Sequence, residues 1–140
     1  MPEYKKPLPS LNNPRTKPFW EAAKQHELMF QRCPECGYYR NPPAPRCPEC
    51  LAVNDDWVQV SGRGKIWSFN VYHHLFSKTF EAEIPYNTAL VELEEGPRLI
   101  TNIVGVRNED LRVEMPVEVY FDDVTDEVSL VKFKPMTQSA

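Results

Sequence analysis

The sequence predicts a mainly β protein with one short helix near its N-terminus and a small five-stranded antiparallel barrel after it. Two observations carry this prediction. Beyond residue 60, five strand-like segments follow one another at roughly ten- to fifteen-residue intervals, with little helix-forming sequence between them. Before residue 60, all four cysteines of the 140-residue chain lie within positions 33–50. The chain therefore divides into a cysteine-rich part and a β-rich part.

The first residues predict an extended arm followed by a short helix. The arm is rich in proline and locally basic, which is typical of a solvated tail or of a segment that lies on a partner or a phosphate group. Thr16 can cap a helix, Pro18 is tolerated in its first turn, and apolar residues then recur at helical spacing. We therefore expect an amphipathic helix over residues 17–26, with Phe19 and Trp20 as its large apolar groups and as candidate docking residues.

The cysteines form two Cys-Pro-Glu-Cys pairs, and this spacing predicts a metal site. Two residues between thiols suit a turn that aims both sulfur atoms at one point, and two such turns give a tetrahedral shell. Gly37 after the first pair is free to take a positive φ, whereas Leu51 after the second pair is expected to loosen that turn. Four thiolates leave no coordination position for water, so the expected cofactor is a structural Zn²⁺. The ligands would be Cys33, Cys36, Cys47 and Cys50.

A disulfide or redox role and an iron site are the alternatives to zinc. Small secreted domains often use disulfides, but no apolar run preceded by basic residues opens the chain. No span approaches the ~20 apolar residues that cross a bilayer, so we expect a soluble cytoplasmic protein. Tetrahedral sulfur also suits iron, and metal analysis would separate these possibilities. The proline-rich loop over residues 37–46 is too short for a helix and is typical of the arm of a rubredoxin-like zinc ribbon.

Strand patterns surround and follow the cysteines. Residues 28–32 lead into the first pair, and residues 57–60 follow the second pair and precede a flexible turn at residues 61–64. In the next segment, Trp67 and Phe69 are expected to face the barrel core. Closing five strands into a barrel removes exposed edges, and a five-stranded Greek-key barrel is an OB-fold. The barrel strands are expected at residues 65–72, 87–94, 98–106, 115–122 and 128–134.

The ordered series of motifs along the chain resembles the DUF35 family, whose members combine a zinc ribbon with an OB-fold and are associated with acyl-CoA enzymes. The resemblance implies an accessory subunit beside a thiolase, a related condensing enzyme, an aldolase or a hydratase. Several such subunits bind the acyl-CoA while the partner performs the chemistry. Leu51 and Glu114 stand where glycine is common in the family. The motifs are the Phe-Trp pair, QRCPECG at 31–37, CPEC at 47–50, GRGKI at 62–66, PY at 85–86, ALVELEEG at 89–96 and MPVEV at 115–119.

The residue inventory favours a chain without activity of its own. All thiols are assigned to the metal, no Gly-x-Ser-x-Gly turn is present, and the adjacent residues His73 and His74 would point to opposite faces of a strand. We therefore expect no catalytic residue. A CoA thioester would need cations for its phosphates and an aromatic crevice, although a surface charge is the simpler interpretation of each cation. The candidates are Arg63, Lys65, Tyr72, Phe76, Arg98 and Arg107.

Charge disfavours the competing class, a single-stranded nucleic-acid-binding OB module. Sixteen basic residues face twenty acidic ones, whereas polyanion binding needs clustered Lys and Arg. A structural adaptor that touches no ligand is a third class. The sequence predicts a zinc-stabilised, acyl-CoA-binding accessory subunit of a thiolase-like complex, with a hydratase or aldolase as the alternative partner and without membrane or nucleic-acid contact. The expected divisions are the arm and helix (1–27), the ribbon (28–60) and the OB-fold (61–136).

Overall fold

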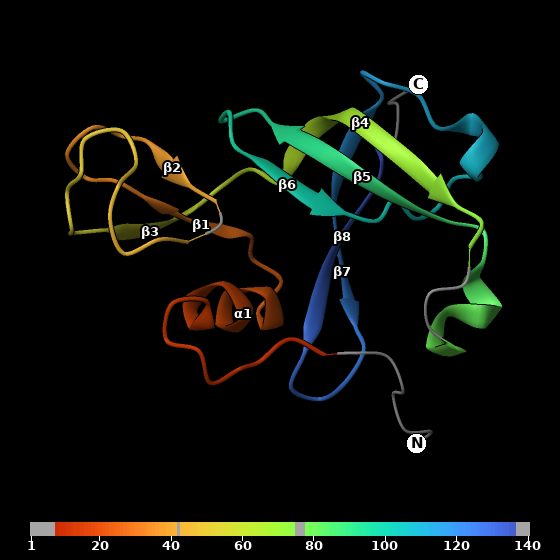
Figure 1. Cartoon of the computed structure of the whole chain (residues 1–140), viewed down its shortest axis with the longest axis horizontal. Helices are drawn as coiled ribbons and strands as arrows, with labels where there is room; N and C mark the ends of the chain where they lie inside the picture. Colours follow the sequence, from red (N-terminus) through yellow and green to blue (C-terminus); the bar gives the residue numbers. More distant parts are fainter. Residues whose placement is uncertain (1–7, 42, 75–77, 137–140) are drawn as a thin grey trace.

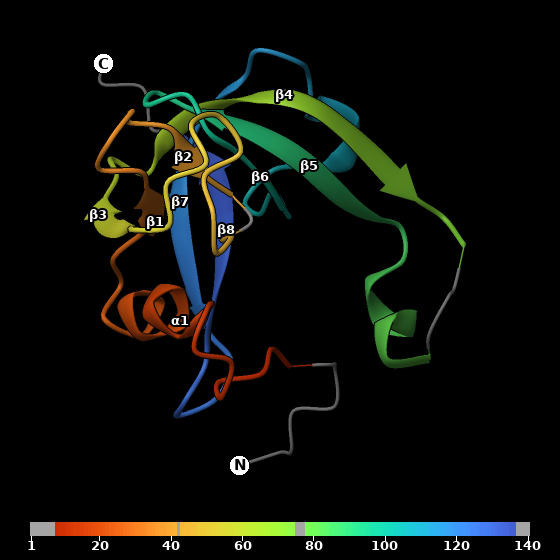
Figure 2. The same cartoon turned by 60° about the vertical axis from the view of Figure 1, so that its left-hand side comes forward.

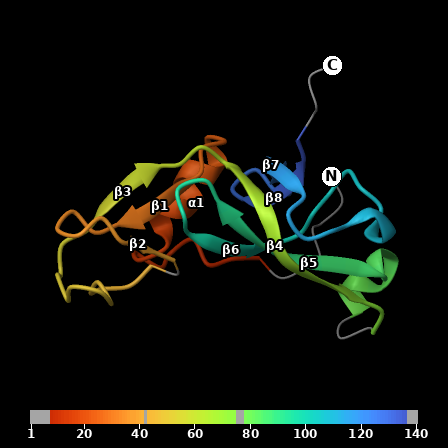
Figure 3. The same ribbon diagram turned by 90° about the horizontal axis from the view of Figure 1, so that it is seen from above.

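The computed structural model confirms the mainly β architecture with one short helix (Figure 1). It describes residues 8–41, 43–74 and 78–136. Figures 1 and 3 both show a small three-stranded sheet at one end of the molecule and the far end of the β4–β5 hairpin at the other. The elements are α1 (Lys17–Lys24), β1 (Met29–Arg32), β2 (Tyr39–Arg40), β3 (Asp56–Gln59), β4 (Arg63–Tyr72), η1 (Lys78–Glu83), β5 (Tyr86–Leu93), β6 (Arg98–Thr101), η2 (Asn108–Asp110), β7 (Pro116–Asp123) and β8 (Ser129–Pro135).

Helix α1 packs on β1 and β8 and is shorter than predicted. It ends at Lys24 because the chain turns at His26, whose backbone takes a left-handed φ of 60°. Ala22 and Ala23 are buried against the rest of the chain. The Phe19 ring is half-buried and lies 6.4 Å from the Phe30 ring, centroid to centroid. The aromatic residues that we expected to dock a partner are therefore partly used in packing the helix.

The three-stranded sheet has the order β2-β1-β3 and carries the cysteine loops. Its strands pair antiparallel, with Gln31 opposite Arg40 and Phe30 opposite Val58. The first cysteine pair lies in the connection between β1 and β2, and the second lies in the long connection between β2 and β3. This sheet and its two loops form the ribbon.

The five-stranded sheet has the order β6-β5-β4-β7-β8 and curls into a half-barrel that matches an OB-fold (Figure 2). All five predicted strands are present. The third ends at Thr101 and not at residue 106, because the chain then crosses to β8, where Ile103 bridges Phe133. The most buried core residues come from four different strands and are joined by Leu28 and Phe30 from the ribbon side, so the two sheets share one core. Those four core residues are Ile66, Val91, Val117 and Phe133.

Two predictions about the start of β4 are wrong in detail. The flexible turn is shorter than expected, because Gly64 already pairs within the sheet, so close to Glu92 that a Cβ there would collide with its carbonyl. Trp67 is 44% exposed and not in the core, because a β-bulge shifts the register between Ile66 and Ser68 and turns its side chain outward. Phe69 packs against the core as predicted.

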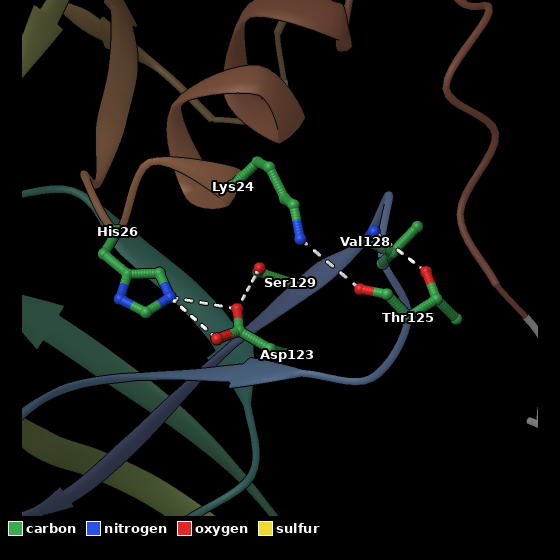
Figure 4. Close-up of polar contacts among 6 residues, drawn as sticks. All are labelled: Lys24, His26, Asp123, Thr125, Val128 and Ser129. Carbon is green, nitrogen blue, oxygen red and sulfur yellow. Dashed lines mark hydrogen bonds and ion pairs between the residues drawn. The ribbon is translucent and has the colours of Figure 1, made fainter. Parts of the chain in front are cut away.

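A polar cluster fastens the end of α1 to the β7–β8 hairpin (Figure 4). His26 Nε2 lies 2.9 Å from Asp123 Oδ1, and the imidazole stacks on the Phe121 ring with centroids 5.1 Å apart. The buried Ser129 hydroxyl donates to the same carboxylate. Lys24 Nζ donates to the Thr125 carbonyl at 3.4 Å. We call the contacts of His26, Asp123 and Ser129 the helix clamp.

Asp123→Asn is expected to destabilise the protein at neutral pH but not in acid. The Ser129 hydroxyl and the His26 ring hold the pKa of Asp123 below its ordinary value of 3.8. Because the folded-state pKa is the lower one, this carboxylate stabilises the fold above pH 3.8, and its contribution is lost as the pH falls through the lowered pKa. Urea unfolding of wild type and variant should therefore differ at neutral pH and converge in strong acid.

Asp126→Asn is the matched control, because Asp126 is exposed on the same hairpin. It should unfold like the wild type throughout. An Asp123→Asn defect that persists unchanged in strong acid would contradict the assigned role of the carboxylate.

Candidate metal centre and adjoining cleft

The four cysteine sulfur atoms converge at the end of the ribbon. All four lie within 4.8 Å of one another, with Cys33 Sγ 3.5 Å from Cys50 Sγ and Cys36 Sγ 3.5 Å from Cys47 Sγ. Zinc–thiolate bonds of about 2.3 Å in a tetrahedron place the sulfur atoms about 3.8 Å apart, whereas a disulfide requires about 2.05 Å. The cysteines are free, and their donor set fits a four-thiolate metal site.

The two cysteine turns have the same backbone hydrogen bonds. Gly37 N–H donates to the Cys33 carbonyl and Leu51 N–H donates to the Cys47 carbonyl, each at 2.9 Å. Both residues are left-handed, with φ of 81° for Gly37 and 67° for Leu51. The second turn is therefore not loosened by leucine, contrary to our expectation. The leucine instead adopts a conformation that glycine takes with less strain.

Glu114 is the other residue that stands where glycine is common in the family, and its backbone is left-handed like that of Leu51. Its φ is 75°, a left-handed conformation in which glycine is favoured. The glutamate side chain forms an ion pair with Lys65 Nζ at 3.0 Å.

The surroundings of the sulfur atoms give the thiols of Cys33 and Cys36 different pKa values. Burial raises the pKa of Cys33, but hydrogen bonds from the backbone of Cys36 and Glu35 and from neighbouring thiols outweigh it and lower the pKa to about 6. The backbone of Tyr38 lowers the pKa of Cys36, but burial and the neighbouring thiols raise it to about 12. Thiolates this close together repel, and a bound divalent cation is what allows all four to ionise.

The predicted cations are all paired with carboxylates. Arg63 contacts Glu94 and Arg98 contacts Glu92, each pair at 3.0–3.1 Å, while Lys65 contacts Glu114. Arg107 is largely exposed and pairs with Asp110 on η2 at 3.0 Å. These pairs do not form one positive surface.

The predicted acyl-CoA contacts do not meet in one site. Arg63 and Lys65 line one shallow cavity of about 430 Å³, and Arg98 lines another. Tyr72 stacks on Tyr86. Phe76 lies outside the described residues.

The second cavity is a cleft of about 560 Å³ between the ribbon and the β5–β6 turn. Arg32 lies on the ribbon side, where its Nε donates to the Gly37 carbonyl at 3.2 Å and its guanidinium faces the Tyr39 ring. Arg98 lies on the barrel side, with its guanidinium 4.3 Å from the centre of the Trp67 ring. Asn41 Nδ2 donates to the Arg98 carbonyl at 2.6 Å and joins the two sides. We call this the ribbon–barrel cleft.

Of the residues that line the ribbon–barrel cleft, only Arg98 was predicted from the sequence to contact a ligand. Arg32, Tyr38 and Tyr39, which line the ribbon side, were not predicted. The available signal was the clustering of basic and aromatic residues directly around the first cysteine pair. What the sequence could not supply was the facing wall, because the β5–β6 turn is distant in the chain.

The helix clamp contains serine, histidine and aspartate, but not in a catalytic arrangement. In a nucleophilic triad the serine hydroxyl donates to the histidine, which the carboxylate orients. Here the Ser129 hydroxyl donates to Asp123, and the carboxylate lies between the other two groups. This trio therefore lacks the contact that activates a serine.

None of the described helices has the length and hydrophobicity of a bilayer-crossing segment.

Two family models match this chain, one for a zinc ribbon and one for an OB-fold. Residues 20–54 match the rubredoxin-like zinc ribbon domain of ChsH2, and residues 57–122 match its C-terminal OB-fold domain. A DUF35 domain-containing scaffold protein of Methanocaldococcus jannaschii is 35% identical over 125 residues, which cover 84% of this chain and 88% of the relative. The chain belongs to the DUF35 family.

Other relatives carry names of acyl-CoA enzyme subunits. The "Probable enoyl-CoA hydratase alpha subunit" of Thermomonospora curvata is 42% identical over 96% of this chain, which spans only 41% of that protein's length. Benzoylsuccinyl-CoA thiolase subunit BbsA of Thauera aromatica is 29% identical, covering 76% of this chain and 74% of the relative. A chain of the solved Ltp2-ChsH2(DUF35) aldolase is 39% identical with a TM-score of 0.82, covering 91% of this chain and 98% of that chain.

Leu51→Gly is expected to stabilise the metal-loaded protein by about 0.5–1 kcal/mol, because glycine takes the left-handed conformation without strain. Leu51 is 61% exposed, so little packing is lost. The check is the free energy of unfolding from denaturant titration with zinc in excess. Gly37→Leu, the reverse change in the matching turn, should destabilise the protein, and a destabilising Leu51→Gly would contradict the equivalence of the two turns.

Proposed function

We propose that this chain is a zinc-stabilised, non-catalytic accessory subunit of an acyl-CoA enzyme, and that it supplies part of the surface that binds the thioester. The observation that carries the proposal is the convergence of the four sulfur atoms. A four-thiolate site has no open position for water or substrate, and it leaves the chain without a free thiol for acyl transfer.

Zinc is the metal that we propose for Cys33, Cys36, Cys47 and Cys50. The matching domain is a zinc ribbon, and the spacing of the sulfur atoms suits a tetrahedral ion. Bound there, zinc supplies folding free energy to a unit that is too small to fold by burying apolar surface. Metal analysis of the purified chain separates zinc from iron.

The proposed partner is an enzyme that acts on CoA thioesters. The relatives include a hydratase subunit, a thiolase subunit and a chain of an aldolase complex. A thiolase-like partner and a hydratase- or aldolase-type partner both fit these names. The hydratase subunit and the aldolase chain have higher identity to this chain than the thiolase subunit has, so they are the first partners to test.

The ribbon–barrel cleft is the proposed contact for the thioester. Its volume of about 560 Å³ falls within the usual range of ligand sites, and it places two arginines beside two tyrosines. Guanidinium groups suit the phosphates of CoA, and aromatic rings suit its adenine or pantetheine. The Arg98 side chain is held in place by Glu92 and Trp67. A nucleic-acid ligand is less well supported, because the net charge is −4.

Changing both arginines of the cleft, Arg32→Gln with Arg98→Gln, should weaken binding of a short acyl-CoA at least 10-fold, because each guanidinium contact with a phosphate is charge-assisted. Calorimetry on the full chain, alone and with its partner, measures this. Arg107→Gln is the matched control, since Arg107 is exposed just before η2 and lines neither wall of the cleft, and it should bind like the wild type. Equal losses in the control, or tight salt-sensitive binding of a single-stranded oligonucleotide, would overturn the proposed ligand.

Trp20→Ala should reduce the amount of an acyl-CoA enzyme that co-purifies with the tagged chain from its native host. Trp20 is only half-buried, whereas Phe19 also packs against the core, so the tryptophan can be removed with less damage. Tyr120→Ala, which changes an exposed aromatic residue on β7, is the control. Unchanged co-purification would exclude docking through α1, and thioester turnover by the isolated chain would refute the accessory role.

A further inference from the structure

Arg40 is buried in the ribbon with its permanent charge. The residue is 2% exposed, and its guanidinium donates only to backbone carbonyls. The acceptors are Ala44 at 3.3 Å, Ala52 at 3.3 Å and Asn54 at 2.7 Å. Its Nε has no hydrogen-bond partner, and no carboxylate of the described residues forms an ion pair with it. A buried charge without a counter-charge is strongly unfavourable, so the burial of Arg40 requires a compensating interaction.

The position of Arg40 links the two cysteine turns. Its backbone pairs with Gln31, and the first turn lies in the loop between these two residues. Its side chain reaches carbonyls on both sides of the second turn. The Ala52 carbonyl that it contacts also accepts the Cys47 N–H at 2.9 Å. Arg40 therefore connects the strand that carries one cysteine pair to the backbone that orients the other.

Gln31 completes this connection from the opposite strand. It is 3% exposed, its Oε1 accepts the Ala44 N–H at 2.8 Å, and its Nε2 donates to the Asp55 carboxylate. Gln31 and Arg40 together hold both ends of the segment that contains the second turn. Pairing of β3 with β1 begins only after this segment, at Asp56. We call the two residues the ribbon brace.

A four-thiolate metal centre would supply the missing counter-charge. Four thiolates around a divalent cation leave a net negative charge, and a buried guanidinium in the same small unit offsets it. We propose that Arg40, supported by Gln31, is the positioning residue of the metal centre: it fixes the second cysteine pair against the first and offsets the charge of the tetrathiolate site. This inference rests on the proposed zinc site but assigns no part in binding acyl-CoA.

The test compares zinc affinity among full-length variants by competition with a chromophoric chelator. Arg40→Met should weaken zinc binding about 10- to 100-fold, the usual cost of losing a group that supports metal ligands. Arg40→Lys keeps the charge but loses the forked donors, so its affinity should lie between those of the wild type and Arg40→Met. The matched control is Arg46→Met, because Arg46 is exposed and donates to a carbonyl of the same turn, that of Leu51 at 2.8 Å. It should bind within about 2-fold of the wild type.

A second readout separates positioning from general damage. Cobalt substitution gives sulfur-to-metal charge-transfer absorption that reports all four thiolates, and Arg40→Met should reduce it at a cobalt concentration that saturates Arg46→Met. Wild-type protein that takes up neither ion would refute the proposed zinc site. If the wild type binds zinc tightly and Arg40→Met binds it within about 2-fold of the wild type, the role of Arg40 is overturned but the proposed zinc site is not. If Arg40→Met does not fold, Arg40→Lys decides, and wild-type affinity in that variant overturns the proposal.

Discussion

The convergence of four sulfur atoms is the constraint on which the rest of the structure depends. The ribbon has almost no apolar interior of its own: its most buried groups besides the cysteines include the polar side chains of Gln31 and Arg40. Such a unit gains too little from burying apolar surface to offset the entropy of ordering its loops. A metal bound by the cysteines would supply the difference, and backbone hydrogen bonds within the two turns direct the sulfur atoms to one point.

The ribbon and the preceding helix α1 are fixed to the barrel by contacts of three kinds. Leu28 and Phe30 extend the barrel core into the ribbon, Asn41 bonds to the backbone of β6, and the helix clamp holds α1 against the β7–β8 hairpin. Each kind of contact acts at a different part of the interface. A cleft between two units that are joined in this way keeps its shape, which is what a subunit needs if it acts by placing a ligand and not by reacting with it.

Local spacing made the metal site and the strand pattern predictable, because both are encoded within a few residues. The two cysteine pairs define their own turns, and alternation of apolar residues defines most strands. The errors arose where a distant residue decides the outcome. Trp67 follows the alternating pattern, yet a bulge set by pairing with β5 turns it outward. His26 and Asp123 lie 97 residues apart in sequence, so no spacing indicated that they meet.

Arg40 is a further residue whose position could not be predicted from the sequence around it. In the sequence it is one more basic residue between two cysteine pairs, and composition favours an exposed position. Only the folded loops show three carbonyls turned toward it. The departures at Leu51 and Glu114 were visible in the sequence, but their meaning required the left-handed backbone that both residues adopt.

The cysteine cluster and the ribbon–barrel cleft share the first cysteine turn. Arg32 directly precedes Cys33, and its side chain is held by the carbonyl of Gly37, the residue that closes the turn. Tyr38 lines the cleft, and its carbonyl accepts the Cys33 N–H at 2.8 Å. The groups that orient the sulfur atoms of the first pair thus also form one wall of the cleft. A metal with no chemical step of its own would then still set the affinity for a ligand, because the wall keeps its geometry only while the turn is closed.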